Sequence, residues 1–146
     1  MKKHFNLSRY KELLQLEESG KDSLFDKTFL ELWSYKANIE DQISYNRKEN
    51  YFSLIDKYLS RVIAPHEFRS KFLEMENQDS RTASIIMQDF RELEVFTLAD
   101  DLEEFSDLIS QISTLCFGYY EVWDGTMKRM SESEFYNLVN NCYLQF

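Results

Sequence analysis

The chain has 146 residues, of which 43% are hydrophobic and 16% aromatic, so it carries enough apolar surface for one core and lacks the composition of a disordered protein. Three glycines and one proline are present, whereas a sheet protein of this size needs many tight turns. The net charge of −9 argues against direct contact with nucleic-acid phosphates.

Two helices are predicted in the first third of the chain. Ser8 can cap a helix over Arg9–Glu18, and Gly20 is placed to stop it. A longer helix starts at residues 22–23 and reaches about residue 46. Its apolar residues recur mostly at the three- and four-residue steps of a helix face, and they are Leu24, Phe25, Phe29, Leu32, Trp33, Ile39 and Ile43.

The middle of the chain predicts two further helices, one on each side of the single proline. The first ends near Val62, and its apolar residues are Tyr51, Leu54, Ile55, Tyr58, Leu59 and Val62. Pro65 fits the first turn of the next helix, because the N–H that proline lacks is unpaired at that position. This helix carries Phe68 and Phe72 and loses its apolar pattern at residues 76–80.

The last part of the chain predicts three helices. A less regular one covers Ile85–Phe96, and Asp124-Gly125 marks a turn. Ser131 and Glu134 form a capping-box pattern in front of a final helix. The clearest apolar stripe belongs to the helix between the Ile85–Phe96 segment and the final helix. It consists of Leu102, Phe105, Leu108, Ile109, Ile112, Leu115, Cys116 and Tyr119.

Together these elements predict an all-α fold. We expect a compact antiparallel helical bundle of five to seven helices with no sheet, in a single domain over residues 1–146. The residues expected to be buried in its core are Leu32, Trp33, Leu54, Ile55, Leu59, Phe68, Phe72, Phe105, Leu108, Ile112, Leu115 and Leu138.

The sequence offers little for catalysis. Three glycines cannot build a phosphate-binding loop, and the two histidines lack further metal ligands at short helical spacing. We interpret His4 as part of a frayed N-terminus and His66 as a surface residue in the first turn of a helix. We therefore expect that the protein is not an enzyme and that it has no catalytic residue, no cofactor and no metal site.

The cysteines and the N-terminus bear on the compartment. Cys116 and Cys142 lie far apart, and we interpret them as reduced core thiols of a cytoplasmic protein, with a single disulfide as the alternative. The N-terminus lacks the apolar run of a secretory signal. No uncharged stretch approaches the ~20 residues of a membrane span.

A run of acidic residues is the clearest indication of function. Residues 81–146 hold 4 Lys or Arg against 12 Asp or Glu, a net charge of −8, whereas residues 1–80 carry −1. The residues of interest are Glu92, Asp100, Asp101, Glu103, Glu104 and Asp107. Acids near a helix N-terminus favour its dipole, which accounts for Asp100 and Asp101. The others form either a solvated face or a surface that attracts a basic partner.

An aromatic stretch follows the same predicted helix, over residues 116–123. One interpretation is packing in the core and at the helix end, because so many rings must be mostly buried. The other is a half-exposed cluster for partner binding, in which Tyr120 and Trp123 are the anchors.

The segment Leu54-Ile55-Asp56-Lys57-Tyr58-Leu59 leads through a short turn into Pro65-His66-Glu67-Phe68. This resembles the opening of the colicin D immunity family, where a helix with a Leu-Ile-x-x-Tyr-Leu core precedes a helix containing Glu-Phe. Leu108–Tyr120 and Ser131–Leu144 resemble the third and fourth helices of that family. The resemblance covers about residues 51–146, and residues 1–50 would be an N-terminal helical extension.

The resemblance implies a non-catalytic, immunity-type inhibitor that blocks the basic active site of a nuclease toxin. An acidic surface can compete with RNA for a positively charged cleft. The expected partner is a basic protein, with no direct contact to nucleic acid or membrane. The alternative is an accessory subunit held in a larger complex by its aromatic surface and its N-terminal helices. The oligomeric state is left open.

Overall fold

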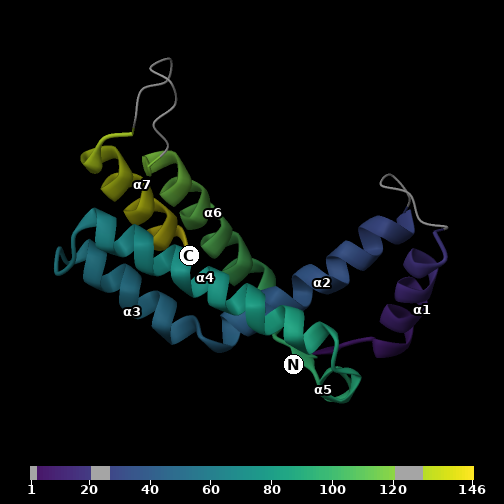
Figure 1. Ribbon diagram of the computed structural model, residues 1–146. Helices are drawn as coiled ribbons and strands as arrows, with labels where there is room; N and C mark the ends of the chain where they lie inside the picture. Colours follow the sequence, from purple (N-terminus) through teal and green to yellow (C-terminus); the bar gives the residue numbers. More distant parts are fainter. Residues whose placement is uncertain (1–2, 21–26, 121–129) are drawn as a thin grey trace. The chain divides into compact units, whose positions relative to one another are not determined.

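The computed structural model describes residues 3–20, 27–120 and 130–146. Within these ranges the chain forms seven α-helices and one pair of short strands, which confirms the all-α class (Figure 1). Strand β1 (Lys3–His4) pairs antiparallel with β2 (Thr97–Leu98). The expectation of no sheet is therefore wrong in this detail, and His4 lies in a strand instead of a frayed end.

The chain divides into two compact units, each built from two separate stretches of sequence. Unit 1 comprises Met1–Asn46 and Asp79–Leu102. Unit 2 comprises Arg47–Gln78 and Glu103–Phe146. Helix α4 (Pro65–Met87) begins in unit 2 and ends in unit 1, so both units use part of the same helix.

Unit 1 contains α1 (Leu7–Glu18), α2 (Lys27–Asn46), the short α5 (Phe90–Glu94) and the end of α4. The pair β1–β2 joins its two stretches of sequence through the ladder His4–Thr97 and Lys3–Leu98. The expected start of the second helix at residues 22–23 lies outside the described residues.

The ends of α1 follow from two local residues. Asn6, and not Ser8, caps the helix, because its Oδ1 accepts a hydrogen bond from the Arg9 N–H at 3.2 Å. The helix therefore begins two residues earlier than predicted. Gly20 follows the C-terminus at φ +70°, a left-handed conformation that glycine adopts without steric cost. Its predicted role as a stop is confirmed.

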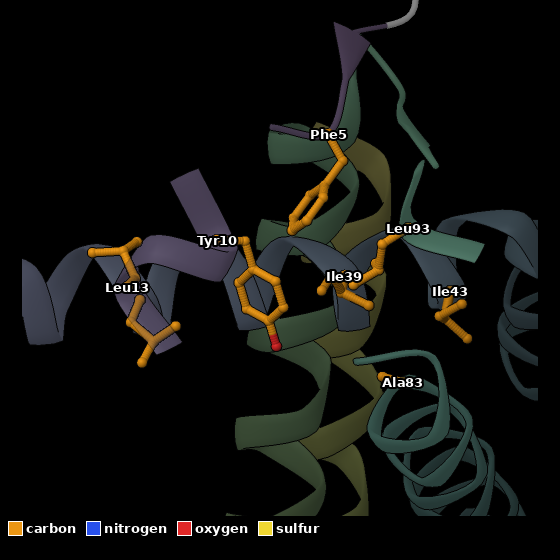
Figure 2. Packing of buried hydrophobic residues seen from close by; sticks show 8 residues of the cluster. Phe5, Tyr10, Leu13, Ile39, Ile43, Ala83 and Leu93 are labelled. Atoms are coloured by element: carbon orange, nitrogen blue, oxygen red, sulfur yellow. The ribbon is translucent and has the colours of Figure 1, made fainter. Parts of the chain in front are cut away.

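A single hydrophobic cluster forms the core of unit 1 (Figure 2). Phe5 packs edge-on against Tyr10 of α1 and Tyr35 of α2, with both pairs of ring centroids 5.4 Å apart. Burying a large apolar side chain stabilises a fold by roughly 1.5–3 kcal/mol. The buried members of the cluster are Phe5, Tyr10, Leu13, Leu32, Ile39, Ile43, Ala83 and Leu93.

Unit 2 is a helical bundle of α3 (Lys48–Leu59), the first part of α4, α6 (Leu102–Tyr120) and α7 (Glu132–Gln145) (Figure 1). One of the two hydrogen bonds of the predicted capping box is confirmed, namely the one that the Ser131 side chain accepts. The Ser131 Oγ accepts from the Glu134 N–H at 3.1 Å, and α7 begins one residue later.

Aromatic rings from all four helices fill the core of unit 2. Tyr58 of α3 stacks on Phe68 of α4, and Tyr119 of α6 stacks on Phe135 of α7, each pair with centroids 4.5 Å apart. Tyr51 meets Phe72 and Phe105 edge-on at 5.4 and 6.1 Å. Stacked and edge-on pairs stabilise beyond the area they bury, by roughly 0.5–1.5 kcal/mol each.

Helix α4 does not stop where its apolar pattern fades at residues 76–80. It continues to Met87, so the separate helix predicted over Ile85–Phe96 is present only as the short α5, and the predicted start at Ile85 is wrong. The continuation packs through a polar residue: Asp79 is buried and accepts a hydrogen bond from the Ser44 hydroxyl of α2 at 3.0 Å. Ala83, one turn later, is buried as well.

Eight of the twelve residues predicted for the core are buried, and they are Leu32, Leu54, Ile55, Phe68, Phe72, Phe105, Leu108 and Ile112. Leu59 and Leu115 are half-buried. The prediction of burial is wrong for Trp33 and Leu138, which expose 63% and 40% of their surface. Consecutive helical residues point about 100° apart, so Leu32 takes the inward position and Trp33 does not. In α7, Phe135 and Val139 take the inward positions.

Candidate functional site

The acidic residues of the predicted run are all exposed. Glu92 lies on α5, and Asp100 and Asp101 lie in the turn before α6; these three belong to unit 1. Glu103, Glu104 and Asp107 lie in the first two turns of α6 and belong to unit 2. All six residues are therefore accessible, as both the solvated face and the partner surface require.

The three acids of α6 form the part of the run with the simplest geometry. Glu103 and Asp107 are four residues apart, so they lie one above the other on the helix surface, with Glu104 beside them. None of the three side chains makes an ion pair or hydrogen bond with a described residue. The helix dipole favours Glu103 and Glu104 in the first turn, but its effect fades by Asp107.

Two acids of unit 1 have structural partners. The Tyr45 hydroxyl donates to Asp101 Oδ1 at 2.6 Å and so attaches the turn before α6 to α2. At the start of α5, the Glu92 N–H donates to the Asp89 side chain, which caps the helix. Their backbone or side-chain contacts give both positions a role in the fold besides any role in binding.

The two aromatic residues of the predicted site cannot be placed. Trp123 and the side chain of Tyr120 lie outside the described residues. The nearby Tyr119 is buried against Phe135, and Cys116 is buried too. The core interpretation is therefore confirmed for Cys116 and Tyr119, whereas Phe117 exposes 50% of its surface and does not fit it.

Sequence reasoning missed a cavity of about 430 Å³ in unit 1. Helix α2 supplies most of its wall, and α1 and α4 contribute one residue each. The aromatic part is Trp33, whose ring meets Phe29 edge-on at 6.5 Å. The lining residues are Glu17, Phe29, Leu32, Trp33, Lys36, Ala37, Glu40, Asp41 and Met87.

Carboxylates surround the apolar part of this cavity. Lys36 forms an ion pair with Glu17 at 3.8 Å. Burial raises the pKa of the Glu40 carboxyl, and the charges of Asp41 and Asp79 raise it further, while a hydrogen bond from Ser80 opposes the shift. An aromatic wall beside carboxylates fits the aliphatic stem and cationic head of a lysine or arginine.

Other reactive groups were located among the described residues. Burial raises the pKa of the Cys116 thiol to about 12, and both cysteines are free thiols, as predicted. His66 is exposed in the first turn of α4, also as predicted.

Within the described ranges, no three His, Cys, Asp or Glu side chains gather closely enough to hold a metal ion. In the same ranges, no helix combines the length and the apolar character needed to span a membrane.

Comparison with known proteins gives no relative: no family model, no curated protein and no solved structure matches the chain. The likeness to the colicin D immunity family therefore stays a prediction that rests on the sequence motif. Two separate candidate sites are defined by their own geometry: the acids of α6 in unit 2, and the aromatic cavity in unit 1.

Proposed function

We propose that this protein is a non-catalytic, acidic protein-binding domain whose partner is a basic protein. The observation that carries the proposal is the trio Glu103, Glu104 and Asp107, exposed on one helix and without an ion pair to any described residue. Like charges held this close repel one another and destabilise a helix slightly. A cationic partner relieves that repulsion on binding.

Charge also acts before contact. Exposed carboxylates add little to folding, but their fields sum over a face and raise the encounter rate with an oppositely charged surface. The net charge of −9 adds to this attraction at long range. The partner is expected to present Lys and Arg around a cleft or patch that meets α6.

The more specific form of the proposal is an immunity-type inhibitor of a nuclease toxin. A nuclease that cleaves RNA binds phosphates with a basic active site, so an acidic protein can occupy the same surface. The test measures RNA cleavage by a ribonuclease domain of the colicin D class with increasing amounts of the chain. Inhibition that more RNA relieves is the expected result.

The matched variants are two double charge reversals with the same change in net charge. Glu103→Lys with Asp107→Lys should weaken inhibition, whereas Glu18→Lys with Glu74→Lys should leave it nearly unchanged, because those exposed acids lie on other helices. Absence of inhibition by the wild type, or equal inhibition by both variants, would contradict the immunity-type function.

A second candidate function is favoured by the exposed apolar residues of α2. Leu30 and Trp33 expose 55% and 63% of their surface, and tryptophan is a frequent anchor of interfaces. These residues fit an accessory subunit held in a larger complex through its N-terminal helices. Such an association would persist at high salt and weaken in Trp33→Ala, whereas binding through α6 would be salt-sensitive and unaffected by that change.

A further inference from the structure

The turn between α3 and α4 holds a residue in an unfavourable conformation. Arg61 has φ 61°, in the left-handed region that non-glycine residues seldom occupy. Its N–H donates to the Tyr58 carbonyl at 2.9 Å, and the Val62 N–H donates to the Lys57 carbonyl at 2.8 Å. These two bonds form the helix-ending motif in which glycine is the usual residue. The backbone alone thus gives no reason for an arginine at position 61.

The side chain of Arg61 lies over an aromatic ring. Its guanidinium carbon is 4.2 Å from the centroid of Tyr136 in α7, and it forms no ion pair with a described residue. The Tyr136 hydroxyl donates to the Leu59 carbonyl at 2.6 Å, which fixes the ring beneath the cation. A charged group is thereby held in a defined place, and no described side chain occupies its donors.

A cavity of about 520 Å³ in unit 2 is lined by both residues. Pro65, the first residue of α4, and Glu132 and Ser133, the first two residues of α7, lie in its wall. Helix N-termini carry partial positive charge and backbone N–H groups without partners inside the helix. The lining residues are Tyr58, Arg61, Ile63, Pro65, Glu132, Ser133, Tyr136 and Asn137.

Tyr58 lines this cavity, and its hydroxyl is a polar group that the structure covers. Its side chain is 3% exposed, and its hydroxyl is buried with no hydrogen-bond partner among the described residues. A buried hydroxyl without a partner destabilises a protein unless something else bonds to it. Burial raises the pKa of Tyr58 to about 12, and the nearby charges include Arg61 and Glu132 of the cavity wall. Like any tyrosine, Tyr58 is protonated at neutral pH, so its hydroxyl can donate a hydrogen bond.

We propose that this cavity binds a small organic carboxylate, with its oxygens on Arg61 and the start of α7, its body against Ile63 and Pro65, and the Tyr58 hydroxyl, once a small side-chain movement uncovers it, as a further donor. Cavities of this size are typical of sites for small molecules. The Glu132 carboxylate in the wall repels a doubly charged phosphate more strongly than a ligand with one negative charge, so it favours a carboxylate over a phosphate. The carboxylate could be a free molecule or the C-terminus of a peptide, which share this chemistry.

The test is a titration of the full ¹⁵N-labelled chain, followed by backbone NMR shifts. The probes are benzoate, the neutral isostere benzamide, and a five-residue peptide ending in Phe with a free or an amidated C-terminus. We expect saturable shifts at the Arg61 and Ser133 amides with benzoate, and binding of benzamide weaker by about tenfold or more. The peptide pair distinguishes the two sources: tighter binding of the free-acid peptide than of benzoate assigns the cavity to a peptide terminus.

Three variants link the shifts to the site. Arg61→Gly and Tyr58→Phe should each weaken benzoate binding, by about tenfold and about threefold, while the thermal midpoint stays equal or rises. Lys57→Gln removes an exposed cation one turn earlier in α3, outside the cavity, and should leave binding unchanged. Shifts that do not saturate with any carboxylate, equal binding of benzamide, or an equal loss in Lys57→Gln would each overturn the proposal.

Discussion

The guanidinium group of Arg9 donates two hydrogen bonds to the Glu31 carboxylate, from Nε and from Nη2 and both at 2.8 Å, and so joins α1 to α2. Planar pairing of this kind is specific to arginine, because the ammonium group of lysine cannot match both oxygens. The same guanidinium also reaches Glu12 of α1 at 3.0 Å.

This ion pair predicts a pH-dependent contribution to stability. The bond from Arg9 lowers the pKa of Glu31, so its contribution is present above the unfolded-state pKa and is lost as the pH falls through the folded one. Glu31→Gln should therefore lower the thermal midpoint at pH 7 and have no effect in strong acid. Glu18→Gln, at an exposed acid with no described partner, is the control. A difference that persists unchanged in acid would contradict this role.

The core of unit 2 predicts unequal effects of two leucine truncations. Leu108 is 3% exposed and Leu138 is 40% exposed. Leu108→Ala should lower the free energy of unfolding by roughly 2–5 kcal/mol, because it leaves a cavity. Leu138→Ala should lower it by about 1 kcal/mol or less. Urea unfolding of both variants is the measurement, and equal losses would be inconsistent with the packing described.

Helix α2 predicts a similar contrast between consecutive residues. Leu32→Ala should destabilise by roughly 2–5 kcal/mol, since its side chain is 2% exposed in the unit 1 cluster. Trp33→Ala removes a larger side chain but one that is mostly in solvent, and it should destabilise by about 1 kcal/mol or less. A larger loss for Trp33 than for Leu32 would place the tryptophan in the core.

The buried thiol predicts both slow labelling and an alkaline loss of stability. Burial raises the pKa of Cys116 to about 12, so iodoacetamide at pH 8 should label Cys142, which is half-buried, faster than Cys116. Above pH 9 the unfolded thiol ionises while the folded one stays protonated, so unfolding becomes easier as the pH rises to about 12. Cys116→Ala should reduce that alkaline loss, and mass spectrometry of digests gives the labelling order.

Apolar spacing was sufficient to predict the class of fold and most of its helices. It was insufficient where a polar residue replaces an apolar one in a packed face, because the buried Asp79 of α4 reads as a break in the pattern. It also failed where two adjacent apolar residues compete for one inward position. The apolar pattern alone predicts burial for both Leu32 and Trp33. The packing of the neighbouring helices determines which of the two side chains is buried.

The acidic run could be predicted as a surface feature, because charged side chains are rarely buried without partners. The two cavities could not. Trp33 was assigned to the core, and the role of Arg61 depends on a left-handed backbone that periodicity does not reveal in a residue other than glycine. The contact between the rings of Tyr58 and Tyr136 likewise joins helices far apart in the sequence.

The central claim is that the acids of α6 bind a basic partner. The most direct test is the association rate measured as a function of ionic strength. The measurement uses the proposed partner, a ribonuclease domain of the colicin D class, and follows binding by stopped-flow fluorescence. Wild type should associate rapidly at low salt and slow steeply as salt is added, while Glu103→Lys with Asp107→Lys should be slower by about tenfold at low salt and less salt-dependent, with its helical spectrum unchanged. The control reversal at Glu18 and Glu74 should stay close to wild type. Equal rates and equal salt slopes for all three proteins would show that the acids of α6 are only a solvated face.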